Sequence, residues 1–312
     1  MVGISELLGE KEIIFPEVAA LSVGLWIIDK CVWKVKKVQI VGLMTFGAVA
    51  GVCIVRYSPL PFIGNLYLAF VFAAICLLFC RATLIPLFSA CILPVLLHTE
   101  AWVYPVSVCS LSLILVGGQK LMEHYGLRLR HSYTPADRNW KRDSVRWFLI
   151  SGVVFLVFFL AVGTLNVYFI IPPLIVTFVE MVNSKAGFRN RPTQVFLLLT
   201  TASVLGTVSQ IAGHDYLHLP ESVIGAFVIF CLFCIFEWTG KFFAPAGALA
   251  LIPMIVPREG LEWLPVQASI GAVIFISIAM FVFQQCYKWS RAQLIYCATP
   301  TLLREYLNRR KR

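Results

Sequence analysis

Residues 38–56 read VQIVGLMTFGAVAGVCIVR, an apolar run that ends at a single base. A helix that crosses a bilayer needs about 20 mainly apolar residues, and this run has that length. The whole chain has the same character, because 59% of its 312 residues are hydrophobic and 13% are charged. Soluble domains are roughly half apolar and a quarter charged. The sequence therefore predicts an all-α polytopic membrane protein and excludes a water-soluble domain.

Segments of this kind number about 11 in all. They lie at roughly 13–28, 38–56, 65–80, 83–98, 102–117, 146–165, 168–182, 194–213, 222–238, 242–256 and 264–285. An odd number of crossings puts the two termini on opposite sides of the membrane.

The net charge of +10 is interpreted as membrane topology and not as nucleic-acid binding. Most of the 26 lysines and arginines lie in four places that strict alternation puts on one side: 29–37, 118–145, 183–192 and the C-terminal tail. Basic connections stay in the cytoplasm. We therefore expect an integral protein of a bacterial-type cell membrane, with its N-terminus outside and its C-terminus inside.

The two halves of the chain resemble each other, which predicts an internal repeat. Residues 36–45 (KKVQIVGLMT) align with residues 191–200 (RPTQVFLLLT), and Gly51 then aligns with Gly206. A similar offset relates two pairs of prolines with the same spacing: Pro86 and Pro94, Pro245 and Pro253. Each half holds five apolar segments and one segment lies between them, so both halves enter the membrane in the same orientation. This predicts parallel repeats; the alternative is that any two apolar sequences align.

These observations divide the chain into five parts. The first five-segment repeat (1–117) is followed by a basic cytoplasmic loop (118–145), a linking transmembrane helix (146–165), the second repeat (166–286) and a basic tail (287–312). The tail mixes aromatic and aliphatic side chains with bases, which is typical of a helix that lies on an anionic lipid surface.

Four segments that begin with proline are shorter than a bilayer span: 16–28, 84–97, 170–182 and 243–256. Proline suits the first turn of a helix and interrupts any helix before it, so we expect half-helices here. Short, Pro-led segments at corresponding positions of two repeats are typical of a binding site near the middle of the membrane. The alternative is that they are kinked packing helices.

The candidate binding residues lie on these half-helices and on the spans that follow: Pro86, Ser89, Pro245, Ala246, Gly247, Ala248, Pro172, Glu17, Thr45 and Thr200. The start of a helix offers unpaired N–H groups and the positive end of its dipole, which favour an anion. Small residues at 244–248 let a ligand or another helix come close. The hydroxyl groups could add donors, although each could instead bond a carbonyl of its own helix.

Few ionisable residues lie inside the apolar segments. Glu17 directly follows a proline break and is the candidate for a proton-responsive group. Glu180 ends a segment beside a basic connection, which favours a salt bridge with that connection. His214, Asp215 and His218 resemble a metal site only weakly, and a solvated loop is the favoured interpretation. No motif of a soluble enzyme is present, so we expect no enzyme activity, no cofactor and no metal.

The second half of the chain resembles the HPP family of integral membrane proteins. Residues 243–252 read FAPAGALALI, close to the family's signature His-Pro-Pro-Ala-Gly-Ala-x-Ala-Leu-Ile. An IPP motif at 171–173 and an NRP motif at 190–192 precede it in the expected order.

This resemblance covers about residues 146–285, and the first half looks like a diverged second copy. Phe243 and Ala244 stand where the signature has its His and first Pro, so any role of that His is absent here. The resemblance implies a carrier of a small anion such as nitrite.

The sequence thus favours a membrane transporter or channel for a small anion, bound near the midplane where Pro-led half-helices converge. The alternative is a non-transporting scaffold or accessory subunit of a larger membrane complex. The expected partners are the lipid bilayer and the anion, with no nucleic acid, and the chain could form a homo-oligomer.

Overall fold

The fold is described from a computed structural model of the chain. The described residues are 1–28, 31–130, 133–135, 139–164, 166–183 and 191–286, together with 290, 292, 293, 295 and 299. Every regular element among them is a helix. The interfacial tail predicted at 287–312 lies almost entirely outside the described residues.

Seven helices of the described part are long and apolar enough to cross a membrane. They are α3 (Lys37–Tyr57), α4 (Phe62–Cys80), α6 (Val103–His124), α7 (Trp140–Gly163), α9 (Pro192–Gln210) with its continuation η5 (Ile211–Tyr216), α10 (Glu221–Thr239) and α12 (Leu264–Cys286). This confirms an all-α integral membrane protein, as the composition predicts.

The segments expected to be short are indeed shorter helices. They are α2 (Glu17–Ser22) with η2 (Val23–Ile27), α5 (Leu87–Leu97), α8 (Pro172–Asn183), and α11 (Ala244–Leu251) with η6 (Ile252–Met254). Proline directly precedes α2 and α5 and lies in the first turn of α8 and α11. At these positions its fixed φ fits the helix and its missing N–H removes no helical hydrogen bond.

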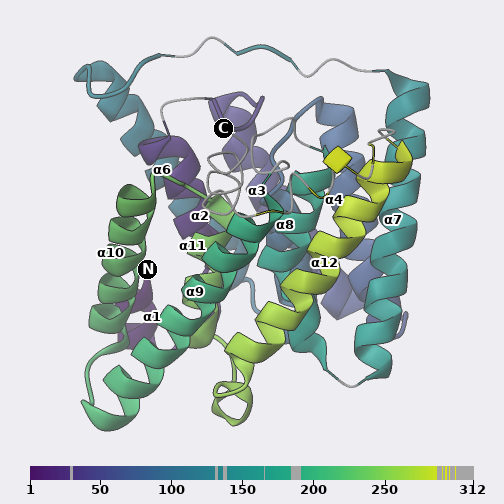
Figure 1. The fold of residues 1–312 in the computed structure, drawn as a ribbon. Coiled ribbons are helices and arrows are strands. Elements are labelled where there is room, and N and C mark those ends of the chain that lie inside the picture. The colour runs from purple at the N-terminus through teal and green to yellow at the C-terminus, as the bar shows by residue number, and fades with distance from the viewer. Residues whose placement is uncertain are drawn as a thin grey trace, which may run out of the picture.

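The short helices form the interior of the bundle. Residues 87–95 of α5, residues 172–182 of α8 and the whole of α11 are buried. The helix α2 packs against α11, α5 packs against α8, and α8 also packs against α11. Long helices enclose this group, with α10 on one flank of the bundle and α7 on the other (Figure 1).

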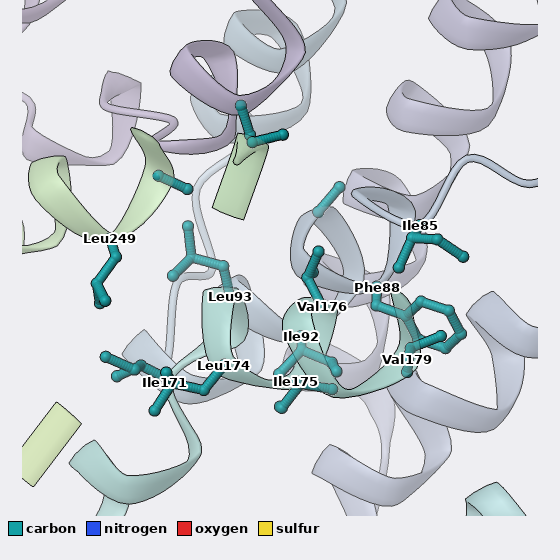
Figure 2. Close-up of a cluster of buried hydrophobic side chains, with 14 of the residues drawn as sticks. Ile85, Phe88, Ile92, Leu93, Ile171, Leu174, Ile175, Val176, Val179 and Leu249 are labelled. Atoms are coloured by element: carbon teal, nitrogen blue, oxygen red, sulfur yellow. The ribbon is translucent and has the colours of Figure 1, made fainter. Parts of the chain in front are cut away.

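Apolar side chains fill the space between three of these short helices. Figure 2 shows Leu174 and Ile175 of α8 beside Ile92 and Leu93 of α5, with Leu249 of α11 in the same cluster. All five side chains are buried. The interior at this level is closely packed, as in the cores of water-soluble proteins.

Two glycines let long helices approach the interior closely. A Cβ atom on Gly51 of α3 would lie 2.4 Å from the carbonyl oxygen of Cys91 on α5. A Cβ atom on Gly206 of α9 would lie 2.2 Å from the carbonyl oxygen of Ala250 on α11. Only a residue without a side chain fits at either place.

Three of the helix ends can be assigned to an end of the bundle. The connection between α6 and α7 lies at the same end of the bundle as the C-terminal end of α12, at the top of Figure 1. The connection between α7 and α8 lies at the opposite end. The helix α6 continues to His124 and α7 begins at Trp140, so helical structure reaches into both edges of the predicted loop 118–145.

The N-terminal region holds an element that the apolar pattern does not predict. The helix α1 (Val2–Leu8) is followed by the short helix η1 (Lys11–Ile13). The carboxylate of Glu6 accepts hydrogen bonds from the backbone N–H groups of Glu221 and Ser222 and from the Ser222 hydroxyl. Glu6 therefore caps the start of α10, where a negative charge is favourable.

Candidate functional site

Glu17 and Ser89 meet in the interior of the bundle. Glu17 is the first residue of α2 and is 1% exposed, while Ser89 lies in the first turn of α5 and is fully buried. The hydroxyl group of Ser89 donates a hydrogen bond to Oε1 of Glu17. The second carboxyl oxygen, Oε2, is buried without a partner at hydrogen-bonding geometry. An unsatisfied carboxyl oxygen in an apolar interior is costly, which marks this position as a candidate site.

Among the described residues, the neighbours of Glu17 carry no formal charge. Tyr104 of α6 lies close enough to interact electrostatically with Glu17 and Cys91. Its hydroxyl group donates to the carbonyl oxygen of Ala90 at 3.2 Å, and its ring lies edge-on against Phe15 at 6.0 Å. Tyr104 is held by these contacts, so its hydroxyl is engaged and does not satisfy the Glu17 carboxyl.

The third helix at this place is α11, which contributes the predicted residue Gly247. A Cβ atom on Gly247 would lie 3.3 Å from the backbone and the side chain of Ala19. The missing side chain therefore lets α11 approach α2 two residues after Glu17. The small residues at 244–248 were expected to let either a ligand or a second helix come close, and the structure shows close packing of a second helix.

The first amide groups of α5 and α11 already have acceptors. The N–H groups of Leu87, Phe88 and Ser89 donate to the carbonyl oxygens of the third residue before each of them, and Ala246 donates to Phe243 in the same way. These turn hydrogen bonds leave fewer donors for a ligand than the sequence argument expects. Polar side chains, above all those of Glu17 and Ser89, are therefore the groups that remain to bind a ligand.

The other predicted residues are distributed over several places. Pro86, Pro172 and Pro245 are buried at the starts of their helices, as are Ala246 and Ala248 on α11. They shape the core and carry no polar side chain toward a ligand.

The two predicted threonines lie on long helices. The Thr45 hydroxyl is buried on α3 without a hydrogen-bond partner. Thr200 pairs with Ser269 at 3.1 Å between α9 and α12. Thr200 also lines a shallow groove of about 400 Å³ along α9 and α10, together with Thr201, Val204 and Ile235. That groove opens to the outside of the bundle, so Thr200 is not part of the Glu17 site.

A second buried carboxyl group is that of Glu180 on α8, which is 8% exposed. Most of the connection that was expected to pair with it, residues 184–190, lies outside the described part of the chain. No ion pair among the described residues involves Glu180. Trp33 is a polar neighbour of Glu180, but its indole nitrogen has no hydrogen-bond partner. The ring of Trp33 lies across Gly24, where a Cβ atom would be 2.4 Å away.

The C-terminal end of the α2–η2 segment is held by a buried arginine. Arg128, in the connection after α6, is 6% exposed and donates to the carbonyl oxygen of Ile28 at 2.5 Å and of Gly24 at 3.4 Å. The indole N–H of Trp26 donates to the carbonyl oxygen of Leu115 at 2.9 Å. A cation at the carbonyl end of a helix is favourable. From the sequence, Arg128 is one of several bases in the predicted cytoplasmic loop 118–145, and no local pattern distinguishes it from its neighbours.

The histidine cluster forms a charge network. Nη2 of Arg258 lies 2.7 Å from Nδ1 of His214, and Nη1 lies 3.2 Å from Asp215. Glu221 lies 4.0 Å from His214 and 3.5 Å from Lys11. Among the residues that the structure describes, no group of three or more His, Cys, Asp or Glu side chains could hold a metal ion. The network joins the N-terminal region to η5, to the start of α10 and to the connection before α12. His214 and Asp215 therefore lie in a helix that continues α9, and not in the solvated loop that the sequence favoured.

Comparison of the chain with protein-family models, with curated proteins and with solved structures finds no match.

Proposed function

We propose that this protein transports a small anion across the membrane together with a proton, and that both bind at Glu17 and Ser89. The observation that carries this proposal is the carboxyl group of Glu17, which is buried where α2, α5 and α11 meet and has an oxygen without a partner. Ionisable groups in membrane interiors are costly to bury and are characteristic of substrate and proton pathways.

The chemistry of the pair suits a small anion. A carboxyl group that carries a proton can donate a hydrogen bond, and the hydroxyl of Ser89 is a second donor once it turns from Oε1 of Glu17 toward the anion. Together they could hold an anion with one or two oxygen atoms, such as nitrite. The bound proton offsets the charge of the anion, which lowers the cost of bringing it into an apolar interior. Binding by side chains also agrees with the engaged amide groups of α5 and α11.

We further propose that the fold consists of two parallel five-segment repeats with the N-terminus outside. Gly51 against α5 and Gly206 against α11 support the repeats, because the sequence alignment pairs these two glycines. The basic residues near one end of the bundle support the orientation. The resemblance of residues 243–252 to the HPP signature supports an anion as the substrate.

The closely packed interior favours a second candidate function. A scaffold or accessory subunit needs helices that pack and no path for a substrate. Contacts such as that of Gly247 with Ala19 serve packing alone under this view. Under the transport proposal, the same contact must open so that the anion can reach Glu17.

Binding of anions to the purified protein separates the two candidates. A ligand that binds the folded state raises the unfolding temperature, by an amount that grows with the logarithm of its concentration relative to its dissociation constant. We propose thermal unfolding in the presence of nitrite, nitrate, formate or chloride, for wild type and Ser89→Ala. The control is Ser110→Ala, because Ser110 is exposed on α6 and bonds its own helix at Val106. A stabilising anion whose effect is lost only in Ser89→Ala supports transport, and no effect of any anion on wild type supports the scaffold.

A further inference from the structure

One face of α9 carries three buried polar side chains that the Glu17 site does not use. They are Ser203, Thr207 and Gln210, here called the polar row, and they are 0%, 2% and 7% exposed. Both hydroxyl oxygens and Oε1 of Gln210 have no hydrogen-bond partner among the described residues. The hydroxyl groups therefore do not bond carbonyl groups of their own helix. Unsatisfied polar groups in an apolar interior are costly, and three in succession indicate a bound ligand.

The polar row faces the seam that α9 forms with α11 and α12. Residues three and four apart lie on the same face of a helix, so the three side chains follow one another along α9. Around the helix, the row lies between Gly206 and Thr200. Gly206 packs against Ala250 of α11, and Thr200 pairs with Ser269 of α12.

The first half of the chain shows that close packing at this place does not need polar groups. The alignment of the two halves pairs Gly51 of α3 with Gly206 of α9. At the same offset, the polar row corresponds to Ala48, Val52 and Val55. Ala48 and Val52 are 0% exposed, and α3 packs against α5 as α9 packs against α11. Apolar side chains suffice there, so the polar row of α9 serves another purpose.

The polar row leads to the charge network at the end of α9. His214 follows Gln210 by four residues, in η5, and it contacts Arg258 and Asp215. The side chain of His214 is 37% exposed, so the network is open to solvent. From Ser203 to His214 the helix rises by about 16 Å, which is about half of the hydrocarbon core of a bilayer. Polar groups thus connect the solvent at this end with the middle of the bundle.

Water is the ligand that fits the polar row. Side chains three or four residues apart on a helix are about 5–6 Å apart, and one water molecule that bonds to both spans about the same distance. Hydroxyl groups donate and accept, so they continue a chain of hydrogen bonds. The unpartnered atom of Gln210 is a carbonyl oxygen, which accepts from water and repels an anion. The row is therefore suited to water and protons, and the anion needs another route.

We propose that the polar row binds a file of water molecules through which protons pass between the outer solution and the middle of the bundle. Each water molecule accepts a proton from its outer neighbour and passes another to its inner neighbour, so one proton enters the file as one leaves it. The binding of water rests on the buried polar atoms, whereas the use of these protons rests on the proposed function and on the proposed orientation. The file adds the path by which protons reach the interior.

Exchange of thiol protons in heavy water tests the file in the purified full-length protein. In a background without the native cysteines, Ser203→Cys and Thr207→Cys place thiols in the row, and Ala48→Cys and Val52→Cys are the matched controls on α3. The infrared S–H band decays as deuterium replaces the proton. We expect exchange in the row to be faster by about tenfold or more, because a buried thiol without water exchanges only through local opening. Equal rates in either matched pair overturn the proposal.

Continuity of the file is tested by removing its middle hydroxyl group. Thr207→Val keeps the size of the side chain, and exchange of Ser203→Cys beyond it should slow severalfold. The control Thr201→Val makes the same change at an exposed position of α9 and should leave the exchange unchanged. Equal slowing by both variants, or by neither, overturns a continuous file.

Uptake of nitrite by proteoliposomes, with the outside more acidic than the inside, tests the use of the protons. Thr207→Val should lower the initial rate severalfold, and Thr201→Val should not. Unchanged uptake in Thr207→Val overturns the delivery of protons by the polar row. Absence of uptake in wild type overturns the proposed function instead, and the thiol exchange rates then decide whether the row binds water.

Discussion

Gly206 of α9 lies so close to the carbonyl oxygen of Ala250 on α11 that a Cβ atom would be 2.2 Å from it. Gly51 of α3 has the same relationship with Cys91 on α5, at 2.4 Å. In both cases a proline of the short helix is a further contact of the glycine. The interior of the bundle therefore depends on two long helices that each present a bare backbone to a short one.

Gly51→Ala should destabilise the protein, because the new methyl group overlaps the backbone of α5. Overpacking of a tight interior costs about 1–3 kcal/mol. The matched control is Gly42→Ala on the same helix, where nothing lies within 4 Å of the added atom. There the loss of flexibility in the unfolded chain should leave stability unchanged or raise it by about 0.4–1 kcal/mol. Thermal unfolding of the purified variants measures both, and equal unfolding temperatures would refute the close approach.

Gly247→Val should lower the unfolding temperature, because a Cβ atom there is already 3.3 Å from Ala19 and two further methyl groups need space. The anion-dependent stabilisation should also be lost, since α2 and Glu17 must shift. Gly152→Val on the exposed face of α7 is the control and should change neither quantity. A Gly247→Val protein with a full response to the anion would show that the site lies elsewhere.

Arg128→Met should loosen the α2–η2 segment. The variant keeps much of the length of the side chain but leaves the carbonyl groups of Gly24 and Ile28 without their donor. Loss of hydrogen bonds from a charged group costs about 1.5–3 kcal/mol. Arg130→Met, two residues away at an exposed position, is the control. Hydrogen exchange of residues 17–28 should accelerate in the first variant only, and unchanged exchange would argue against the cap.

Single cysteines placed at Leu129 and Leu60 test the orientation. Both residues are exposed, and they lie in the connections after α6 and α3, respectively. In a background without the native cysteines, an impermeant maleimide added to intact cells should label position 60 and not position 129. Labelling of position 129 from outside would contradict both the orientation and the parallel repeats.

The parts of the fold that follow from length and local chemistry could be predicted from the sequence. Long apolar runs gave the spans, and proline at the start of a short run located α2, α5, α8 and α11. The contact between Glu17 and Ser89 joins residues 72 positions apart, and no local pattern reports it. The same holds for Arg128 and Ile28, which are 100 positions apart.

The sequence analysis expects free N–H groups at the helix starts to bind an anion, and the structure shows why residue types alone do not predict such groups. Proline interrupts a helix, but the chain before it still supplies carbonyl groups that accept from the first turn, as Ile85 does for Phe88. Whether an N–H group at a helix start is free depends on the conformation of the preceding residues, and residue types alone do not determine that conformation. The position of Glu17 is visible in the sequence, because it follows a proline break inside an apolar segment, and this position makes it the candidate for a proton-responsive group.

The most direct test of the transport proposal is uptake of labelled nitrite by proteoliposomes that contain wild type, Ser89→Ala or Ser110→Ala. With the outside more acidic than the inside, wild type and Ser110→Ala should accumulate nitrite faster than vesicles without protein, and Ser89→Ala should not. Uptake by wild type no faster than by empty vesicles, for nitrite and for the other small anions, would contradict the proposal.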